Sequence, residues 1–454
     1  MALWVLVRTV QSDDAADVLL DRALRRSSLD VRDRGLAVEL AYGVLRRMAT
    51  IDWSLQGVAD RPLPRLPVLV LMILRLGAYQ ILFLNKIPPS AAVNESVKLA
   101  QAFRRTLLRD WSGFINAVLR SLLRRPAPDL PTIESEPVQA LAVRNSIPKW
   151  LAARWIERHG ITEAQLLSER SAATPPLCLR VNRLRTTRTA LLDKLENAGV
   201  DAKPTAVSPV GVIVKAAGTV PSLPGFQEGE FYVEDEAAQL IPPLLDPQPG
   251  EVVLDACAAP GGKSTHLAEL MLDRGVIAAV DRKQERLAQL QANCARLGVG
   301  IVRPILHDIR QASQSLPSLH TKLGLQDGFF DRIMVDAPCS GLGVLRRHPE
   351  AKWRKRADAF SRHQRVQLQI LDAVAPCLRR GGVLVYSTCS TEREENEEVI
   401  AQFCRNHADF RRESVSPWLP SSARRFLTAQ GDLSTRDNQE SMDGFYAARL
   451  VKDD

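Results

Sequence analysis

The stretch that decides the fold is residues 254–265, L-D-A-C-A-A-P-G-G-K-S-T. An apolar run ends there at Asp255, a Pro-Gly-Gly turn follows, and Lys263 is expected to open a helix. The letters G-G-K-S-T match the end of a phosphate-binding P-loop, whose full pattern G-x-x-x-x-G-K-[ST] wraps backbone amides around a phosphate. That pattern requires a glycine where this chain has Cys257, so it fails at the position that lets the loop curl. Because Asp336 ends a later apolar run, as a Walker B acid does, a P-loop hydrolase stays as an alternative.

Two acidic residues follow the next two predicted strands. Residues 276–280 form an apolar run that ends in Asp281, 26 residues after Asp255, and an acid at this place can accept both hydroxyls of a ribose. Residues 301–306 are followed by Asp308, which is placed to reach an adenine edge. A single such aspartate is commonly only a helix N-cap, but acids at successive strand ends make that explanation weak. The glycine loop and these acids predict an adenosine compound without a triphosphate, and S-adenosylmethionine fits.

Strands and helices alternate regularly from about residue 231 onwards. Short apolar strands that alternate with helices predict a doubly wound, mainly parallel sheet, in which ligands bind at the carboxyl ends of the strands. We therefore expect a Rossmann-like α/β catalytic domain over residues 231–454. The predicted strands are residues 251–256, 276–280, 301–306, 331–335 and 382–386, and the predicted helices are residues 263–273, 283–297, 358–378 and 391–405.

The first half of the chain has a different pattern. Residues 1–125 carry apolar residues at helical spacing and nothing that alternates like a strand, so we predict an all-α domain. Its longest apolar run, 68–84, is short for a membrane span and contains Arg75, so it is predicted to be a buried helix. Four prolines with polar fill predict a linker over 126–139. Residues 140–230 begin helically and then change to a small α/β middle subdomain. Its predicted strands are residues 177–181 and 210–214, and its predicted helix is 187–198.

Positive charge is concentrated in the N-terminal part. Residues 1–125 contain 19 Lys+Arg and 11 Asp+Glu, a net charge of 19 − 11 = +8, whereas the remainder holds 41 of each. Arginine accounts for 17 of the 19 basic residues, and its forked guanidinium suits phosphate contacts. A polyanionic partner is therefore favoured, with a solvated helical surface as the alternative. Because the N-terminus, M-A-L-W-V-L-V-R, lacks the features of a secretory signal, we expect a cytoplasmic protein without a membrane anchor.

Seven cysteines are scattered along the chain without a C-x-x-C pair, so we expect neither a disulfide framework nor a metal site. Two of them stand apart because each follows a predicted strand: Cys339 lies in D-A-P-C-S-G and Cys389 in Y-S-T-C-S. If these strands are neighbours in the sheet, both thiols emerge at the ligand edge. Cys257 lies in the cofactor loop, where a packing role suffices. The others are expected to be small buried residues: Cys178, Cys294, Cys377 and Cys404.

A thiol at the cofactor edge suits one kind of methyl transfer. Carbon 5 of a pyrimidine is a poor nucleophile, but a thiolate that adds to carbon 6 makes carbon 5 enamine-like, so that it can attack an electrophilic methyl group. Asp336 is positioned to hydrogen-bond the base edge and to assist protonation at N3. The thiol then leaves by elimination once the carbon 5 proton is removed. Spacing alone does not decide which cysteine attacks.

These motifs together resemble a known family, the RNA 5-methylcytosine methyltransferases of the Sun/Fmu type. The resemblance extends over nearly the whole chain. Its catalytic motifs are L-D-A-C-A-A-P-G-G-K at 254–263, V-D-A-P-C-S-G-L-G-V-L-R-R-H-P-E-A-K-W at 335–353 and Y-S-T-C-S at 386–390. The family's NusB-like helical RNA-binding domain is similar to segments 30–47, 74–101 and 114–120. Its middle region is similar to I-P-K-W at 147–150 and L-R-V-N at 179–182, and its last strand is similar to D-G-F-Y at 443–446.

The resemblance implies a reaction and a set of roles. The reaction is S-adenosylmethionine-dependent methylation of carbon 5 of a cytosine in small-subunit (16S) ribosomal RNA, by a protein expected to be a monomer. Cys389 is then the attacking nucleophile and Cys339 helps to release the product, because this RNA family attacks with the cysteine of its Thr-Cys motif. The positions that correspond to the cofactor-binding ones are Cys257, Ala258, Ala259, Pro260, Gly261, Gly262, Lys263, Asp281, Asp308 and Asp336.

A basic strip directly follows the Cys339 loop. Residues 346–365 hold eight lysines and arginines against two acids, with Trp353 and His348 interleaved. This composition predicts a strip that grips RNA, with a solvated basic helix as the alternative. The target base has to be unstacked before a thiol can reach its carbon 6. The residues expected to contact RNA are Arg346, Arg347, Lys352, Arg354 and Lys355.

Two other functions stay open at this point. The first is 5-methylcytosine formation in another RNA, either tRNA or large-subunit ribosomal RNA. The second is a non-catalytic RNA-binding assembly factor whose methyltransferase fold is vestigial. The intact cysteine pair and the unbroken cofactor loop argue against a relic, which has no reason to keep both.

Overall fold

The computed structural model describes residues 1–125, 128–215, 219–311, 329–436 and 442–453. The chain divides into two compact units. The first consists of Met1–Thr174 together with Leu345–Ala357, and the second of Pro175–Val344 together with Asp358–Asp454.

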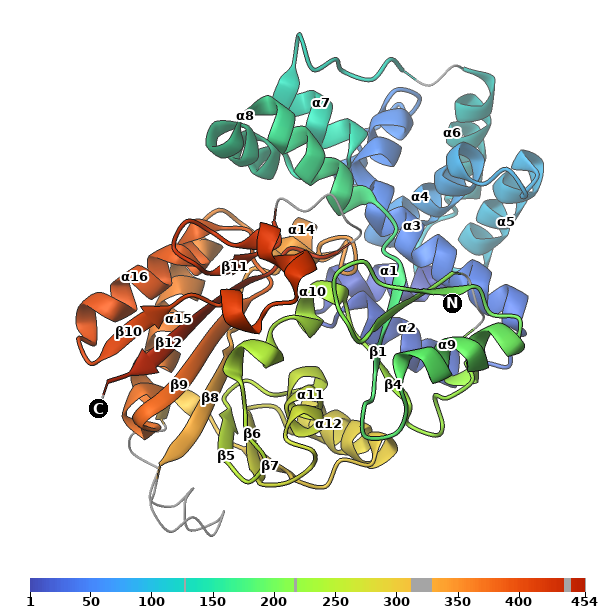
Figure 1. The fold of residues 1–454 in the computed structure, drawn as a ribbon. Helices are drawn as coiled ribbons and strands as arrows, with labels where there is room; N and C mark the ends of the chain where they lie inside the picture. The colour runs from blue at the N-terminus through green and yellow to red at the C-terminus, as the bar shows by residue number, and fades with distance from the viewer. Residues whose placement is uncertain (126–127, 216–218, 312–328, 437–441, 454) are drawn as a thin grey trace. The chain divides into compact units, whose positions relative to one another are not determined.

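The first unit is helical, as predicted for the N-terminal part of the chain (Figure 1). Its core surrounds α4 (Val68–Phe83), which is buried over most of its length. Arg75 in the middle of that helix makes hydrogen bonds of 2.8 and 2.7 Å to Asp52, so its charge is paired. The predicted buried helix is therefore confirmed. The other helices are α1 (Ala2–Gln11), α2 (Ala16–Arg25), α3 (Val31–Gln56), α5 (Pro89–Ala102), α6 (Ser112–Arg124), α7 (Pro137–Arg144), α8 (Lys149–Ala172) and α14 (Ala351–Arg354), with a 3-10 turn η1 (Leu63–Arg65).

One short segment from the second half of the chain is part of the helical unit. In Leu345–Ala357, Trp353 Nε1 donates a hydrogen bond of 3.2 Å to the Leu45 carbonyl. The Glu350 carboxylate accepts a bond of 3.1 Å from Ala16 N at the start of α2. An amide in the first turn of a helix has no partner within the helix, so Glu350 supplies one from a distant part of the sequence.

The second unit begins with a small antiparallel sheet in the order β2-β3-β1-β4. The sequence predicted a middle subdomain that starts at residue 140, but the helices over 137–172 group with the first unit, because α7 packs against both α3 and α8. Of the predicted linker 126–139, residues 126–127 lie outside the described part of the chain, and Pro137 begins α7. The elements are β1 (Leu177–Val181), α9 (Arg188–Asn197), β2 (Ala202–Pro204), β3 (Gly211–Val214) and β4 (Phe231–Val233).

A larger sheet forms the centre of the second unit. Among the described strands its order is β10-β12-β9-β8-β5-β6-β7, with β11 beside β12. The five strands from β7 to β9 are parallel, and β12 is antiparallel to β9 and β10. The predicted mainly parallel sheet is confirmed, and β8 and β9, which precede the two cysteines, are neighbours. The strands are β5 (Val252–Asp255), β6 (Val276–Asp281), β7 (Val302–Leu306), β8 (Phe330–Asp336), β9 (Leu378–Thr388), β10 (Phe410–Glu413), β11 (Leu433–Ser434) and β12 (Tyr446–Lys452).

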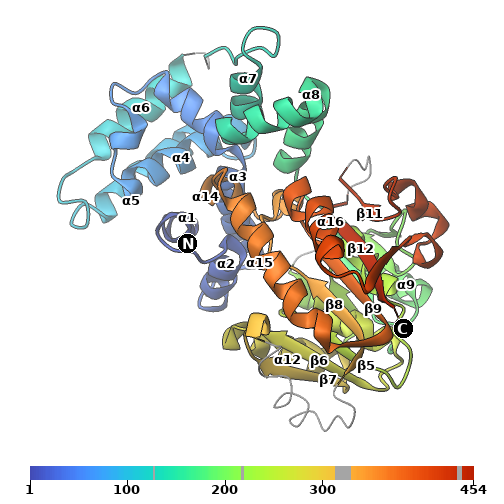
Figure 2. The ribbon, with the colours of Figure 1, turned by 90° about the vertical axis from the view of Figure 1, so that its left-hand side faces the viewer.

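Helices cover both faces of this sheet, and Figure 2 shows α15 running along β8 and β9. Successive strand residues point to opposite faces. Val253 therefore packs in one core with Leu267 of α11 and Leu290 of α12, whereas Leu254 packs in another with Ile370 of α15. These two cores fix the strand ends that carry the site. The helices are α10 (Glu236–Gln239), α11 (Gly262–Leu270), α12 (Gln284–Leu297), α15 (Ala359–Val374) and α16 (Glu397–Asn406).

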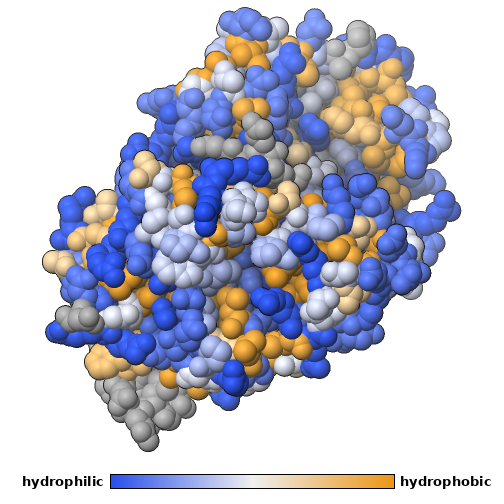
Figure 3. Space-filling view, viewed as in Figure 1, coloured by the Kyte–Doolittle hydropathy of each residue, from blue (hydrophilic) through white to orange (hydrophobic). Residues whose placement is uncertain are grey.

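No helix in the described ranges is long and apolar enough to cross a membrane. Hydrophilic residues dominate the face drawn in Figure 3, with smaller groups of hydrophobic residues between them.

Candidate active site

The glycine loop joins the end of β5 to the start of α11. Gly261 has a φ of 106°, a left-handed conformation that glycine adopts without strain. A Cβ on Gly262 would lie 2.8 Å from Glu234 Oε1, so a larger residue there would displace the Glu234 carboxylate. Ser264 Oγ donates a bond of 2.6 Å to Asp255, whose pKa is raised to about 6 by burial. The loop thus presents the amide end of α11, which attracts anions, at the edge of the sheet.

A buried arginine that the sequence reasoning did not single out supports this loop. Arg180 on β1 is fully buried and donates a bond of 2.6 Å to the Gly262 carbonyl. Its guanidinium also pairs with Glu234 at 2.6 Å and Glu269 at 2.9 Å. Burial alone would lower the pKa of Arg180, but the two carboxylates outweigh it and raise the pKa, so the side chain stays charged. The small sheet therefore holds the glycine loop in place.

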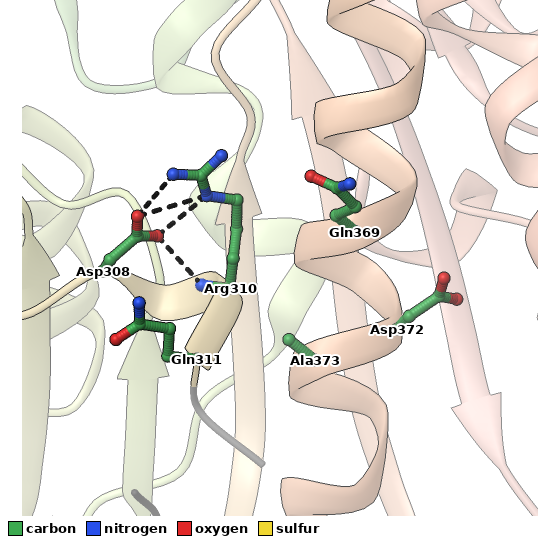
Figure 4. A pocket seen from close by; sticks show the side chains of 6 residues that line it. All are labelled: Asp308, Arg310, Gln311, Gln369, Asp372 and Ala373. Carbon is green, nitrogen blue, oxygen red and sulfur yellow. Dashed lines mark hydrogen bonds and ion pairs between the residues drawn. The ribbon is translucent and has the colours of Figure 1, made fainter. Parts of the chain in front are cut away.

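The two expected strand-end acids lie where predicted: Asp281 is the last residue of β6, and Asp308 follows β7. Asp281 is buried, and its Oδ1 accepts a bond of 2.9 Å from Lys283 N. Asp308 forms an ion pair of 2.5 Å with Arg310, whose hydrogen bonds lower the pKa of the carboxyl. In Figure 4 the Arg310 side chain points toward Asp308 beside a pocket of about 460 Å³. Besides these two residues, the pocket is lined by Gln311 and, from α15, by Gln369, Asp372 and Ala373.

Asp336, at the end of β8, is held between two side chains. Its Oδ2 accepts a bond of 2.7 Å from Lys263 Nζ, and its Oδ1 accepts one of 2.8 Å from Ser387 Oγ. Burial would lower the pKa of Lys263, but the Asp336 charge outweighs it and raises the pKa. In a P-loop the lysine serves a phosphate, whereas Lys263 is engaged by an acid of the catalytic edge. The pair links the glycine loop to the turn that carries Cys339.

The structure brings the two cysteines together. Cys339 Sγ and Cys389 Sγ lie 3.3 Å apart, although 50 residues separate them in the sequence. The hydrogen bond to Cys389, followed by burial, raises the pKa of Cys339 well above its ordinary value. The two sulfurs are within hydrogen-bond reach, so the Cys339 thiol can donate to the Cys389 sulfur. The convergence expected from neighbouring strands is found.

The D-G-F-Y segment before β12 supports the Cys389 turn. Gly343 N donates a bond of 2.9 Å to the Cys389 carbonyl, and Gly444 N donates one of 2.9 Å to the Gly343 carbonyl. A Cβ on Gly343 would lie 1.9 Å from the Gly444 oxygen, so the two backbones approach as closely as glycine allows. The Phe445 ring lies 5.3 Å from Lys263 Nζ. The predicted last strand is thus joined to the site through Gly444 and Phe445, which directly precede β12.

The remaining cysteines do not join this cluster. Cys178, Cys294 and Cys377 are buried, as expected for small packing residues. Burial raises the pKa of Cys257 well above its ordinary value, which disfavours a thiolate there. Within the described residues no group of histidine, cysteine or acidic side chains is arranged to hold a metal ion.

The basic strip has structural contacts that its sequence did not predict. Arg346 and Lys352 are buried, and burial lowers the pKa of Lys352 to about 7. Lys352 Nζ donates a bond of 3.2 Å to the Arg46 carbonyl, and Arg354 donates one of 2.6 Å to the Thr9 carbonyl. These side chains stabilise the helical unit, because each satisfies a backbone carbonyl of that unit. An RNA contact by the strip stays a prediction.

A second residue that the sequence reasoning missed is Glu395. Its carboxylate is fully buried and accepts hydrogen bonds from Ser340 and Ser390, the residues that directly follow the two cysteines. The only signal in the sequence was the acidic run E-R-E-E-N-E-E at 392–398, which has the composition of a solvated helix start.

The chain matches three family models. Residues 242–451 match the 16S rRNA methyltransferase RsmB/F model, residues 1–124 the NusB family, and residues 147–221 the ferredoxin-like domain of RsmF/B-like methyltransferases. Among solved structures it is similar to PH0851, with a TM-score of 0.83 and 25% identity over 99% of this chain and 98% of that one. It is also similar to a methyltransferase homologue from Pyrococcus horikoshii, with a TM-score of 0.57 and 30% identity over 70% of this chain and 99% of that one.

Curated relatives extend over the full length of the chain. A probable ribosomal RNA small subunit methyltransferase B from Bacillus subtilis is 36% identical over 100% of this chain and 98% of its own length. Ribosomal RNA small subunit methyltransferase B from Yersinia enterocolitica is 36% identical over 94% of this chain and 92% of its own. The chain therefore belongs to the RsmB/F family of 16S rRNA methyltransferases.

Proposed function

We propose that this protein methylates carbon 5 of a cytosine in 16S ribosomal RNA, with S-adenosylmethionine as methyl donor and a covalent bond between Cys389 and the base as intermediate. The observation that carries the proposal is the cysteine pair, whose sulfurs lie 3.3 Å apart. Cys339 lies in the turn that follows Asp336, and Asp336 is itself paired with Lys263. The full-length relatives named ribosomal RNA small subunit methyltransferase B support the choice of RNA.

The residues present fit the cofactor. The amide end of α11 suits the carboxylate of a methionine, and Gly261 and Gly262 let the loop pack closely against Leu290 and Glu234 at that end. Asp281 offers carboxylate oxygens for ribose hydroxyls. Asp308 can take an adenine amine once Arg310 turns away from it. S-adenosylmethionine supplies an electrophilic methyl group at this edge, and NSun6 from Pyrococcus horikoshii, a structural relative, was solved with SFG, an analogue of it.

The attack follows from the arrangement of three side chains. The Cys389 sulfur donates an electron pair to carbon 6 of the cytosine and forms the C–S bond, which places electron density on carbon 5. Asp336 hydrogen-bonds the amine edge and N3 side of the base, where charge develops. Lys263 keeps Asp336 in position at 2.7 Å. Carbon 5 would then form its bond to the methyl carbon, whose bond to the sulfonium sulfur of S-adenosylmethionine would break with the electron pair staying on that sulfur.

Release needs the loss of the carbon 5 proton and of the C–S bond. Water accepts the proton from carbon 5, the electron pair of that C–H bond restores the ring double bond, and the electron pair of the C–S bond returns to Cys389. Cys339 is proposed to take part in this step because its sulfur lies 3.3 Å from the Cys389 sulfur.

The experiment is methyl transfer from tritiated S-adenosylmethionine to 16S ribosomal RNA, followed by digestion to nucleosides. The proposal predicts label in 5-methylcytidine. Label in another nucleoside would contradict the carbon 5 assignment. Transfer only to tRNA or large-subunit ribosomal RNA would contradict the substrate, and no transfer to any RNA would favour a non-catalytic assembly factor.

A further inference from the structure

Glu395 lies where the two cysteine turns leave the sheet. The last paired residues of β8 and β9 are Asp336 and Ser387, and Ala337 N still bonds to the Ser387 carbonyl at 2.8 Å. Cys339 and Cys389 come only two residues beyond that point, where the ladder between the strands has ended. Beyond that point the two turns are held together by side-chain contacts, because backbone hydrogen bonds between the strands have ended.

The Glu395 carboxylate does this from a fully buried position. Its Oε1 accepts a bond of 2.7 Å from Ser340 N, and its Oε2 accepts one of 2.5 Å from Ser340 Oγ. The same Oε2 accepts a hydrogen bond from Ser390 Oγ. One carboxylate is therefore bonded to the residue after each cysteine.

Other contacts fix Glu395 itself. Tyr386 on β9 is buried, and its hydroxyl donates a bond of 2.6 Å to the Glu395 carbonyl. The next residue, Asn396, accepts a bond from Thr388 Oγ1 at 2.5 Å and donates one to the Ser390 carbonyl at 2.9 Å. The backbone around Glu395 is thus held to β9, so its carboxylate can act as a fixed point for the Cys339 turn.

We propose that Glu395 is a positioning residue that holds the sulfur of Cys339 within reach of Cys389. The inference about the distance stands on the geometry alone, and its catalytic consequence rests on the proposed function. A thiol that donates to the nucleophile and later takes part in release has to stay within hydrogen-bond reach, and displacements of an ångström are costly to catalysis. Glu395 touches neither the base nor the cofactor in this account and acts only through the two turns.

The proximity can be measured without any methyl transfer, by thiol–disulfide exchange with oxidised dithiothreitol. Two thiols, Cys339 and Cys389, form one disulfide, and the cyclic disulfide is reduced to dithiothreitol, so atoms and electrons balance. Forming the bond brings the sulfurs from 3.3 Å to about 2 Å. The equilibrium constant, read by mass spectrometry of the linked peptides, reports how well the two turns are held together.

The informative variant is Glu395→Gln, because an amide nitrogen cannot accept the bonds that one carboxylate oxygen accepts. Relative to wild type we expect the equilibrium constant to fall about ten-fold or more, the effect of losing hydrogen bonds to a charged group. Glu398→Gln is the matched control, since Glu398 is exposed on α16 and is expected to leave the constant unchanged. Thermal unfolding of each variant checks that it folds.

If Glu395→Gln does not fold, Ser340→Ala and Ser390→Ala carry the test, because each removes a single hydroxyl donor to Glu395. Each is expected to lower the constant about three-fold. An unchanged constant in folded Glu395→Gln, or in both serine variants, overturns the proposal. A wild-type protein that forms no Cys339–Cys389 disulfide overturns it as well, because the geometry would then be wrong.

Activity provides the second measurement. In Glu395→Gln the kcat for methyl transfer is expected to fall about 10- to 100-fold while the KM for S-adenosylmethionine stays within two-fold, since the cofactor residues are untouched. A rise in that KM with unchanged kcat would contradict a role through the cysteines. If the disulfide result holds and wild type forms no 5-methylcytidine, the proposed function fails and the positioning of the sulfurs stands.

Discussion

Lys263 Nζ and Asp336 Oδ2 lie 2.7 Å apart, so the glycine loop and the end of β8 are joined by an ion pair. The lysine comes from the cofactor loop and the aspartate from the cysteine motif, and the sequence analysis assigned both to the same site. Both side chains are largely shielded from water, with 11% and 32% of their surface exposed. Screening is therefore weak, and the pair orients the acid that is proposed to contact the base.

Lys263→Met is expected to lower kcat for methyl transfer about 100-fold, because Asp336 loses the cation that orients it and holds its charge. The measurement is steady-state transfer from labelled S-adenosylmethionine. Lys203→Met, at an exposed lysine of β2, is the matched control. Equal activity of the two variants would show that the ion pair has no catalytic role.

Arg180→Met is expected to reduce the free energy of unfolding by about 3–5 kcal/mol, because two buried carboxylates, Glu234 and Glu269, lose their common partner. The Gly262 carbonyl loses its hydrogen bond too, so the affinity for S-adenosylmethionine is expected to fall. Guanidinium unfolding and calorimetric titration measure the two effects. Arg405→Met, at an exposed arginine of α16, is the control, and a loss no larger than in this control would contradict the supporting role.

Asp255→Asn tests the buried acid of the glycine loop through the pH dependence of stability. Burial raises the pKa of Asp255 to about 6 in the folded protein, above its ordinary value of 3.8. Between these values the folded state binds the extra proton, so the contribution of Asp255 to stability falls as the pH rises. Asparagine does not titrate, so the stability of the variant relative to wild type is expected to increase by up to about 3 kcal/mol from pH 4 to pH 7. Denaturant unfolding at several pH values checks this, and a pH-independent difference would contradict the raised pKa.

Two lysines of the basic strip are expected to behave differently toward RNA. Lys355 is partly exposed and Lys352 is buried against the Arg46 carbonyl. Lys355→Ala is therefore expected to weaken RNA binding and to reduce the slope of log K against log salt by about one. Lys352→Met is expected to leave that slope unchanged and to alter the stability of the helical unit. The reverse pattern in a filter-binding titration would restore Lys352 as an RNA contact.

Local pattern was sufficient for much of the fold and for the strand ends at which the proposed site residues lie. The strands that end at Asp255, Asp281 and Asp336 were predicted because short apolar runs between helices give a parallel sheet. Parallel neighbours also explain why Cys339 and Cys389 converge. The distance of 3.3 Å could not be predicted, because it depends on side-chain contacts beyond the ends of the strands.

The missed features share one physical cause. Arg180, Glu395 and Glu350 bond to groups far away in the sequence or across a turn, and a lone charged residue gives no signal of such a partner. The buried position of Lys352 was missed for the same reason, since eight basic residues in a strip have the composition of a solvated surface. The grouping of α7 and α8 with the helical unit was not predicted, because ordinary helical patterns do not reveal which core a helix joins.

The roles of the two cysteines can be separated by single substitutions. Cys389→Ala is expected to abolish methyl transfer, because no nucleophile is left to activate carbon 5, while S-adenosylmethionine still binds. Cys339→Ala keeps the nucleophile and loses the group proposed to assist release. Calorimetric titration and methyl transfer together distinguish these outcomes, and full activity of Cys389→Ala would contradict its role.

The covalent bond between Cys389 and the base can be tested by denaturing gel electrophoresis of Cys339→Ala with 16S ribosomal RNA and S-adenosylmethionine. We expect a slow band that contains both protein and RNA and that disappears in the Cys339→Ala, Cys389→Ala double variant. No slow band in Cys339→Ala, or a band that persists without Cys389, would contradict it.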